Sequence, residues 1–152
     1  MRTLLLSGTF AVGFALAVHL AMNAAVGKIV ANPRMGNAVF WLIGAAMAGL
    51  IALSRWEVRF WQAARNVPPW LWLAGAIGAC LVFGIAALIP RLGAATTNVV
   101  LLTGQVIGGV LIAHWGALGS PVESITPLRL LGIVVMILGA TIAVSGKIPF
   151  VP

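Results

Sequence analysis

Charged residues are scarce in this sequence. Asp, Glu, Lys and Arg together make up 7% of the 152 residues, whereas a soluble domain has about a quarter. Hydrophobic residues make up 62% of the chain. So few charges cannot cover a water-facing surface. The composition therefore excludes an ordinary soluble domain and predicts a protein whose main solvent is lipid.

Acidic residues are the scarcest of all. The only two are Glu57 and Glu123, against nine Lys and Arg, and both fall in predicted loops. Carriers that exchange cations for protons usually need a carboxylate within the membrane. The lack of one argues against a cation/proton antiporter of the small multidrug type. The basic residues are scattered between apolar runs, which favours lipid headgroups over nucleic acid as their partner.

Cysteine is nearly absent, and Cys80 is the single example. One cysteine cannot form a disulfide within the chain or a cysteine metal site, so we expect it to pack as a small hydrophobic residue. The sequence also lacks a nucleotide-binding motif, a nucleophile–base pair and a metal-ligand cluster. We therefore expect no cofactor, no metal and no enzymatic activity.

The chain instead has five long runs without a charged residue. A helix of about 20 apolar residues crosses ~30 Å of hydrocarbon, and the strict alternation of a barrel strand is absent. The first run is longer than the ~7–15-residue core of a signal peptide, so we interpret it as a retained helix. The sequence predicts an all-α integral membrane protein with one transmembrane domain over residues 1–152. Its expected helices cover approximately 3–27, 36–54, 68–89, 93–115 and 126–147.

Prolines and tryptophans support this division. We expect the segment Asn32–Arg34 to end the first helix and Pro68 with Pro69 to open the third, because proline suits a helix start. We expect the chain to break between Ile89 and Gly93. The tryptophans should anchor helix ends at the headgroups; they are Trp41, Trp56, Trp61, Trp70, Trp72 and Trp115.

The longest loop admits two interpretations. It is either a short interfacial helix, with Arg55 and Arg59 one turn apart, or a solvated connector.

Basic residues are almost evenly divided between the two sides of the predicted membrane domain. The N-terminal side would hold Arg2, Arg55, Arg59, Arg65 and Arg129, and the other side Lys28, Arg34, Arg91 and Lys147. The Lys/Arg bias normally sets orientation. Two alternatives stay open: dual topology, in which the chain inserts both ways and pairs with an inverted copy, or one orientation fixed by the arginines of the long loop. Inverted halves around a midplane site are the architecture of many secondary transporters.

Two polar residues lie within the apolar sequence of the first expected helix. His19 and Asn23 are four residues apart and share one helix face, and polar groups in a span usually face a cavity or the bundle interior. One interpretation is that the pair lines a substrate cavity, with His19 able to accept a proton near neutral pH. The other is an interhelical hydrogen bond.

The fourth helix carries further amides. Asn98 and Gln105 fall on one face and could bind a polar or weakly charged substrate without the cost of a buried charge, or hold helices together. Thr97 is a further candidate that could instead cap the helix. Arg91 stands at the helix break, where it could attract an anionic substrate or anchor to lipid phosphates.

Small residues follow on the same helix. Gly104 and Gly108, with Gly109 adjacent, form a small-xxx-small element that allows helices to approach closely. We interpret it as a helix-packing or dimer contact.

Several motifs carry a family resemblance. They are His19 with Asn23, the run Pro-Arg-Leu-Gly-Ala-Ala-Thr-Thr at 90–97, Gly104-Gln105, and Pro-Leu-Arg-Leu-Leu-Gly at 127–132. With these motifs the chain resembles the YdcZ-like family of inner-membrane exporters in the drug/metabolite transporter (EamA-like) superfamily. The family commonly has Gln where this chain has His19. The resemblance implies five helices, the bacterial inner (plasma) membrane, and members that occur as dual-topology singles, paired genes or fused ten-helix proteins.

Together these features predict a half-size secondary transporter that exports a small metabolite or drug-like solute. It would work as an antiparallel, dual-topology homodimer. Its substrate cavity would be lined by His19, Asn23, Asn98 and Gln105. The expected partners are membrane lipid, an inverted copy of the chain and a small-molecule substrate, without nucleic acid. The alternatives are a small-ion channel and a non-transporting membrane assembly subunit.

Overall fold

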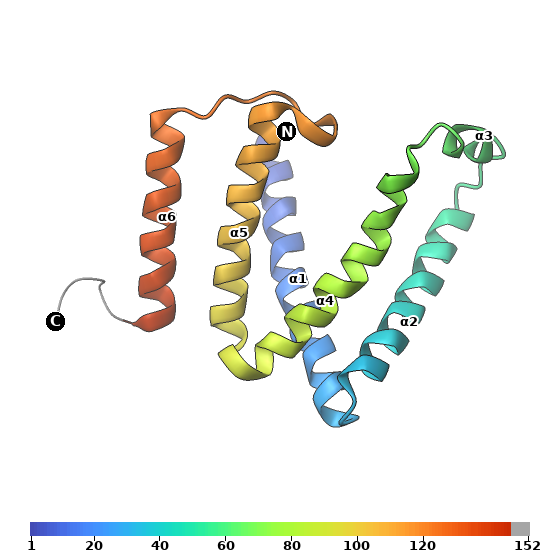
Figure 1. The fold of residues 1–152 in the computed structure, drawn as a ribbon, viewed down its shortest axis with the longest axis horizontal. Coiled ribbons are helices and arrows are strands. Elements are labelled where there is room, and N and C mark those ends of the chain that lie inside the picture. Colours follow the sequence, from blue (N-terminus) through green and yellow to red (C-terminus); the bar gives the residue numbers. More distant parts are fainter. Residues whose placement is uncertain (147–152) are drawn as a thin grey trace. The chain divides into compact units, whose positions relative to one another are not determined.

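The computed structural model describes residues 1–146, and Lys147, the last residue of the predicted fifth helix, lies outside them. Five long helices dominate it (Figure 1): α1 Arg2–Ile29, α2 Pro33–Leu53, α4 Leu73–Leu92, α5 Ala94–Trp115 and α6 Pro127–Ser145. The apolar segments that these helices supply are 19 to 27 residues long, enough to cross a membrane. Three short elements connect them: α3 Phe60–Ala64, η1 Pro69–Trp72 and η2 Ala117–Gly119. With no strand among the described residues, the structure confirms an all-α integral membrane protein.

The long helices bury little of their own apolar surface within the chain. Only 6% of the most apolar window is buried in each of the first four spans, and 0% in the fifth. Large hydrophobic side chains such as Phe10, Phe14 and Leu131 are more than half exposed. In water, apolar exposure costs about 25 cal/mol for each Å². The helices are therefore built to be surrounded by lipid or by another apolar helix.

The helix starts follow capping rules. The Asn32 side chain accepts a hydrogen bond from the Met35 N–H (3.2 Å), and Pro33 occupies the first turn of α2. At α6, the Thr126 hydroxyl accepts from the Arg129 N–H (3.3 Å). Caps of this kind satisfy donors that have no partner within the helix. The segment around Asn32 therefore starts α2 as well as separating it from α1.

The boundaries of α4 differ from the prediction. The helix was expected to end before Pro90, but it continues to Leu92. Proline fixes φ at a helical value, but it removes one helical N–H and its ring crowds the carbonyl four residues earlier. The helix accordingly ends two residues after Pro90. Gly93, with φ of +82°, ends the helix because glycine adopts positive φ without steric cost. At the other end, Pro69–Trp72 forms a separate 3₁₀ turn before α4.

The chain divides into two compact units, Met1–Arg91 and the part that begins at Leu92. In the first unit, α1 and α2 pack as a hairpin connected by residues 30–32. Trp41 lies well inside α2, so the expectation that every tryptophan marks a helix end is wrong for it. Its ring comes within 3.7 Å of the Cβ position of Gly78 on α4. Because Gly78 has no side chain, the ring has room there, and Trp41 connects α2 to α4 by this contact.

The second unit is a pair of helices, α5 and α6, whose connection folds back on them. The Glu123 N–H donates to the Ala113 carbonyl (2.9 Å), and the Ile125 N–H donates to Nδ1 of His114 (3.3 Å). Arg129 forms an ion pair with Glu123 and also donates to the Glu123 carbonyl at 3.2 Å. One of the two acids of the chain is thus paired within this unit.

Gly116 should be the least replaceable residue of this connection. It ends α5 with φ of +59°, and an added Cβ would lie 2.6 Å from Cγ2 of Val122, whereas Gly119 has φ of +78° and open space around it. Gly119→Ala should cost only backbone strain of about 1–2 kcal/mol. Gly116→Ala should cost more, because the exposed Val122 side chain also has to shift away from the added Cβ. Thermal unfolding of the purified protein in detergent would measure both, and equal shifts would contradict the predicted clash.

The connector between α2 and α4 contains a shorter helix than the arginine spacing suggested. The Ser54 hydroxyl donates to the Ile51 carbonyl (2.6 Å) at the end of α2, a local bond that competes with helix continuation. Helix α3 then covers only Phe60–Ala64. Arg55 and Arg59 both precede it, so the interpretation that places them one turn apart on a helix is wrong, although a short helix is present.

Candidate functional site

The polar residues of α1 face α2. Asn23 is 1% exposed, and its Nδ2 donates a hydrogen bond to Oδ1 of Asn37 (3.1 Å). One turn earlier, the His19 ring lies 4.7 Å from the ring of Phe40, between centroids. The structure therefore shows the interhelical hydrogen bond that was one of the two interpretations of Asn23. A role for the same residues in lining a substrate cavity stays a prediction.

Two buried polar atoms on this face lack a partner. Within the described part of the chain, neither Nδ1 of His19 nor Oδ1 of Asn23 has a hydrogen bond. An unpaired buried polar group costs about 1–3 kcal/mol, and most such groups in proteins are satisfied. Lipid offers no hydrogen-bonding substitute. Two unpaired groups one turn apart are what a face that receives a polar ligand would present.

Glycines set the distance between α1 and α2. A Cβ added to Gly36 would lie 3.3 Å from the Cα of Gly27, and one added to Gly27 would lie 3.2 Å from the Cα of Pro33. Small residues allow helix backbones to approach this closely in membranes. The hydrogen bond between the side chains of Asn23 and Asn37 therefore depends on the close approach of Gly27 and Gly36, which lie nearer the turn.

A cavity of about 370 Å³, called here the Asn23 pocket, lies beside this hairpin within the first unit. Its wall includes Asn23, Gly27, Lys28, Ala86, Pro90 and Arg91. Small apolar residues of α1 and α4 form much of it, and the two cations lie exposed at the helix ends. Among the described residues, neither Lys28 nor Arg91 has an ion-pair partner. Arg91 was a predicted candidate for the site, and the pocket places Lys28 beside the same space.

The predicted residues of α5 lie in the second unit. Asn98 donates from Nδ2 to the Ala94 carbonyl of its own helix (2.9 Å), and Gln105 is exposed. Thr97 is 5% exposed, and its hydroxyl donates to the Gly93 carbonyl (2.8 Å). The structure thus brings His19 and Asn23 together on one face. The single cavity that they were predicted to share with Asn98 and Gln105 stays a prediction.

The glycines of α5 have open surroundings. A Cβ added to Gly104, Gly108 or Gly109 would meet nothing within 4 Å. Gly109 lines a cavity of about 470 Å³ between α5 and α6. The helix-packing or dimer contact predicted for these glycines stays a prediction, and the space around them leaves room for a neighbouring helix.

Sequence reasoning missed two residues of the site, Asn37 and Lys28. A signal for Asn37 was present, because it is the one amide in the charge-free run 35–54. The short turn at 30–32 makes α1 and α2 antiparallel, so residues at similar distances from the turn face one another. Asn23 and Asn37 meet this condition. Lys28 has no such signal in the sequence, because its position beside α4 depends on the tertiary fold.

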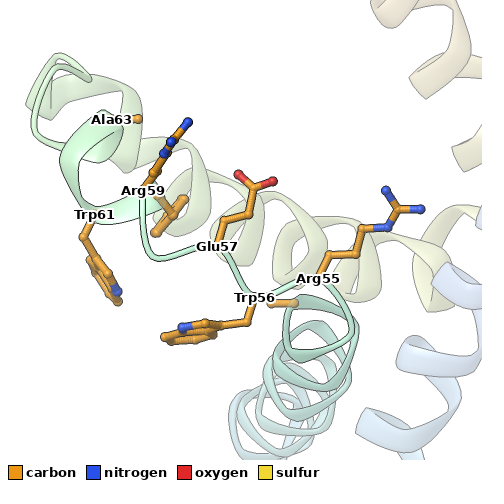
Figure 2. A pocket seen from close by; sticks show the side chains of 8 residues that line it. Arg55, Trp56, Glu57, Arg59, Trp61 and Ala63 are labelled. Carbon is orange, nitrogen blue, oxygen red and sulfur yellow. The ribbon is translucent and has the colours of Figure 1, made fainter.

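A second cavity, of about 550 Å³, lies in the connector between α2 and α4. Figure 2 shows the rings of Trp56 and Trp61 extending to one side of the connector, while the Glu57 carboxylate extends away from them. Aromatic rings combined with arginines are typical of the membrane–water interface. This cavity therefore fits an anchoring role better than a role in solute binding.

A family comparison agrees with these features. The family model described as "Putative inner membrane exporter, YdcZ" matches residues 4–142. No curated protein and no solved structure is significantly similar to the chain. The family match covers all or most of each of the five long helices, including the hairpin with the unpaired polar atoms. The chain therefore belongs to the YdcZ family of inner membrane exporters, within the drug/metabolite transporter superfamily, and is a multi-pass protein of the inner membrane.

Proposed function

We propose that the protein is a half-size secondary transporter, and not an enzyme, that exports a small metabolite or drug-like solute as an antiparallel homodimer. The observation that carries this proposal is the pair of buried, unpaired polar atoms, Nδ1 of His19 and Oδ1 of Asn23, on one face of a membrane helix. A polar solute would satisfy them in turn as it passes. Asn98 and Gln105 complete the proposed cavity, and Thr97 and Arg91 are further candidates.

A dimer would supply the second, inverted half that one chain lacks. Many secondary transporters consist of two inverted halves that rock around a central site, and five spans amount to one such half. The apolar helix surfaces are largely unburied, and the glycine face of α5 has free space for a close helix contact. A second, inverted copy would cover these surfaces and duplicate the polar face of α1.

Dual topology makes a direct prediction. A two-compartment reporter fused after Lys147 should give signal from both sides of the membrane, because the basic residues hardly favour one orientation. Replacing Arg55, Arg59 and Arg65 by Ala should move the C-terminal reporter toward the cytoplasm, since the remaining positive charge then lies mostly on the C-terminal side. Arg34→Ala should move it the opposite way. A signal from one side only, unchanged in both variants, would contradict the inverted homodimer.

Flux measurements separate the proposed carrier from its alternatives. Proteoliposomes would be loaded with glycerate, propionate, glycerol or choline, and efflux followed against concentration. Saturable efflux of any of these solutes would support a carrier, and a current that rises in proportion to voltage would indicate a channel. A protein that releases no solute of any kind and forms a tight complex with a different membrane protein would favour the assembly subunit.

A further inference from the structure

The charges around the Asn23 pocket are of one sign. Lys28 stands in the last turn of α1 and Arg91 in the last turn of α4, and both line the pocket. Neither acid of the chain lines it, and Glu123 is already paired with Arg129. Cations near a helix C-terminus gain about 0.3–1 kcal/mol from the helix dipole. This gain stabilises each cation separately. It does not explain why two unpaired cations line the same pocket.

Asn23, one of the residues that line the pocket, carries a hydrogen-bond acceptor. Oδ1 of Asn23 is buried without a partner among residues 1–146, and it can accept only from an O–H or N–H group. Asn23 precedes Lys28 by five residues, or ~7.5 Å along the helix axis. A ligand that spans this distance would place a negative group near the cations and a hydrogen-bond donor at the amide.

The size of the pocket limits the ligand. Its volume of about 370 Å³ is about twelve times the share of one molecule in liquid water, which is about 30 Å³. A small metabolite fits such a space, which lies near the lower end of the range of about 300–1,000 Å³ that is usual for ligand pockets. Small apolar residues such as Gly27 and Ala86 line the same pocket, which suits the carbon skeleton of such a solute.

We infer that the Asn23 pocket binds a small organic anion that also carries a hydroxyl or other hydrogen-bond donor. The anionic group binds Lys28 and Arg91, and the donor binds the Asn23 amide. This inference rests on the proposed transport function, whose substrate class it names. Carboxylate and phosphate are the anionic groups concerned. A phospholipid headgroup shares this chemistry, so the test has to separate a solute from a lipid.

Three solutes of equal carbon number test both ends of the site. Glycerate has the anion and hydroxyl donors, propionate has only the anion, and glycerol has only the donors. We expect the full chain, in nanodiscs of zwitterionic lipid, to bind glycerate at least about tenfold more tightly than propionate or glycerol. Choline, a cation, should not bind. Equal binding of glycerate and glycerol, preference for choline, or no binding of glycerate would overturn the inference.

Charge variants locate the binding. Lys28→Gln and Arg91→Gln should each weaken glycerate binding about tenfold or more, because each loses a charge-assisted contact. Arg34→Gln is the matched control: it removes a cation close in sequence to the same turn that does not line the pocket, and it should leave binding unchanged. Lys28→Arg and Arg91→Lys retain the charge and should retain most of the binding. An equal loss in Arg34→Gln would show a general charge effect and overturn the site.

Bilayer composition identifies the source of the anion. Adding phosphatidylglycerol to the nanodisc should leave glycerate binding unchanged if the pocket receives a solute. A fall of tenfold or more, reversed by Lys28→Gln, would assign the pocket to a lipid headgroup and overturn the solute inference. Binding is measured here without flux. Glycerate binding in a protein that releases no solute would contradict the transport proposal alone, and efflux of glycerol without glycerate binding would contradict this inference alone.

Discussion

Asn23→Leu is expected to reduce solute efflux from proteoliposomes by about tenfold or more while leaving the protein folded. The substitution removes a buried, unpaired acceptor on a residue that lines the pocket, and also the donor to Asn37. A lost hydrogen bond that leaves a buried group unpaired costs about 1–3 kcal/mol, and ~1.4 kcal/mol corresponds to tenfold in affinity. The measurement is initial efflux of the solute that the wild-type protein releases fastest.

A second substitution separates transport from stability. Asn23→Leu leaves the Asn37 amide without its partner, so its unfolding midpoint should fall. The double variant, with Leu at both positions, should recover most of that stability, because replacing both partners by apolar groups is often nearly neutral. Efflux should stay low in the double variant. Asn66→Leu, which removes an exposed amide in the connector, should change neither quantity. Recovery of efflux together with stability would show that the amide pair only holds the helices together.

Gly36→Leu is expected to open the hairpin of α1 and α2 and to lower both stability and efflux. A Cβ at this position already comes within 3.3–3.4 Å of Gly27 backbone atoms and of Cγ1 of Val26. A Leu side chain would therefore push the helices apart, at a cost of about 1–3 kcal/mol or more. The separation would also break the 3.1 Å bond between Asn23 and Asn37. Thermal unfolding in detergent and efflux from proteoliposomes measure the two effects.

The same helix provides the control. Gly44 also lies in α2, but a Cβ added there would meet nothing within 4 Å. Gly44→Leu introduces the same side chain into the same helix, so it matches the change in helix propensity and hydrophobicity. We expect it to leave the midpoint and the efflux near wild type. A similar loss in both variants would mean that the close contact with Gly27 has no special role in the hairpin.

The scarcity of acidic residues also determines the charge around the pocket. In the sequence it argued only against a carrier that uses a membrane carboxylate to bind cations. In the structure, the same scarcity leaves Lys28 and Arg91 without a counterion among the described residues. A cationic solute would meet repulsion there. The anion-binding inference and the lack of a membrane carboxylate therefore favour the same class of solute.

The sequence by itself determined the class of protein and the number of membrane helices. Long charge-free runs predict spanning helices because lipid cannot satisfy an exposed backbone, and this signal is local. Asn32 and Pro33 marked a helix boundary for the same reason, since caps act within one turn. The family motifs, also local, led to the family that the comparison confirms. The pairing of His19 with Asn23 on one face followed from helical spacing alone.

Only the tertiary structure decided what these residues contact. The partner of Asn23, the unpaired atoms and the pocket that Lys28 shares with Arg91 all depend on how helices distant in sequence meet. Periodicity gives the face of a helix, but it does not give the register or the distance to its neighbour. At the hairpin these are set by the contact of Gly27 with Gly36, because side chains with a Cβ would hold the backbones farther apart.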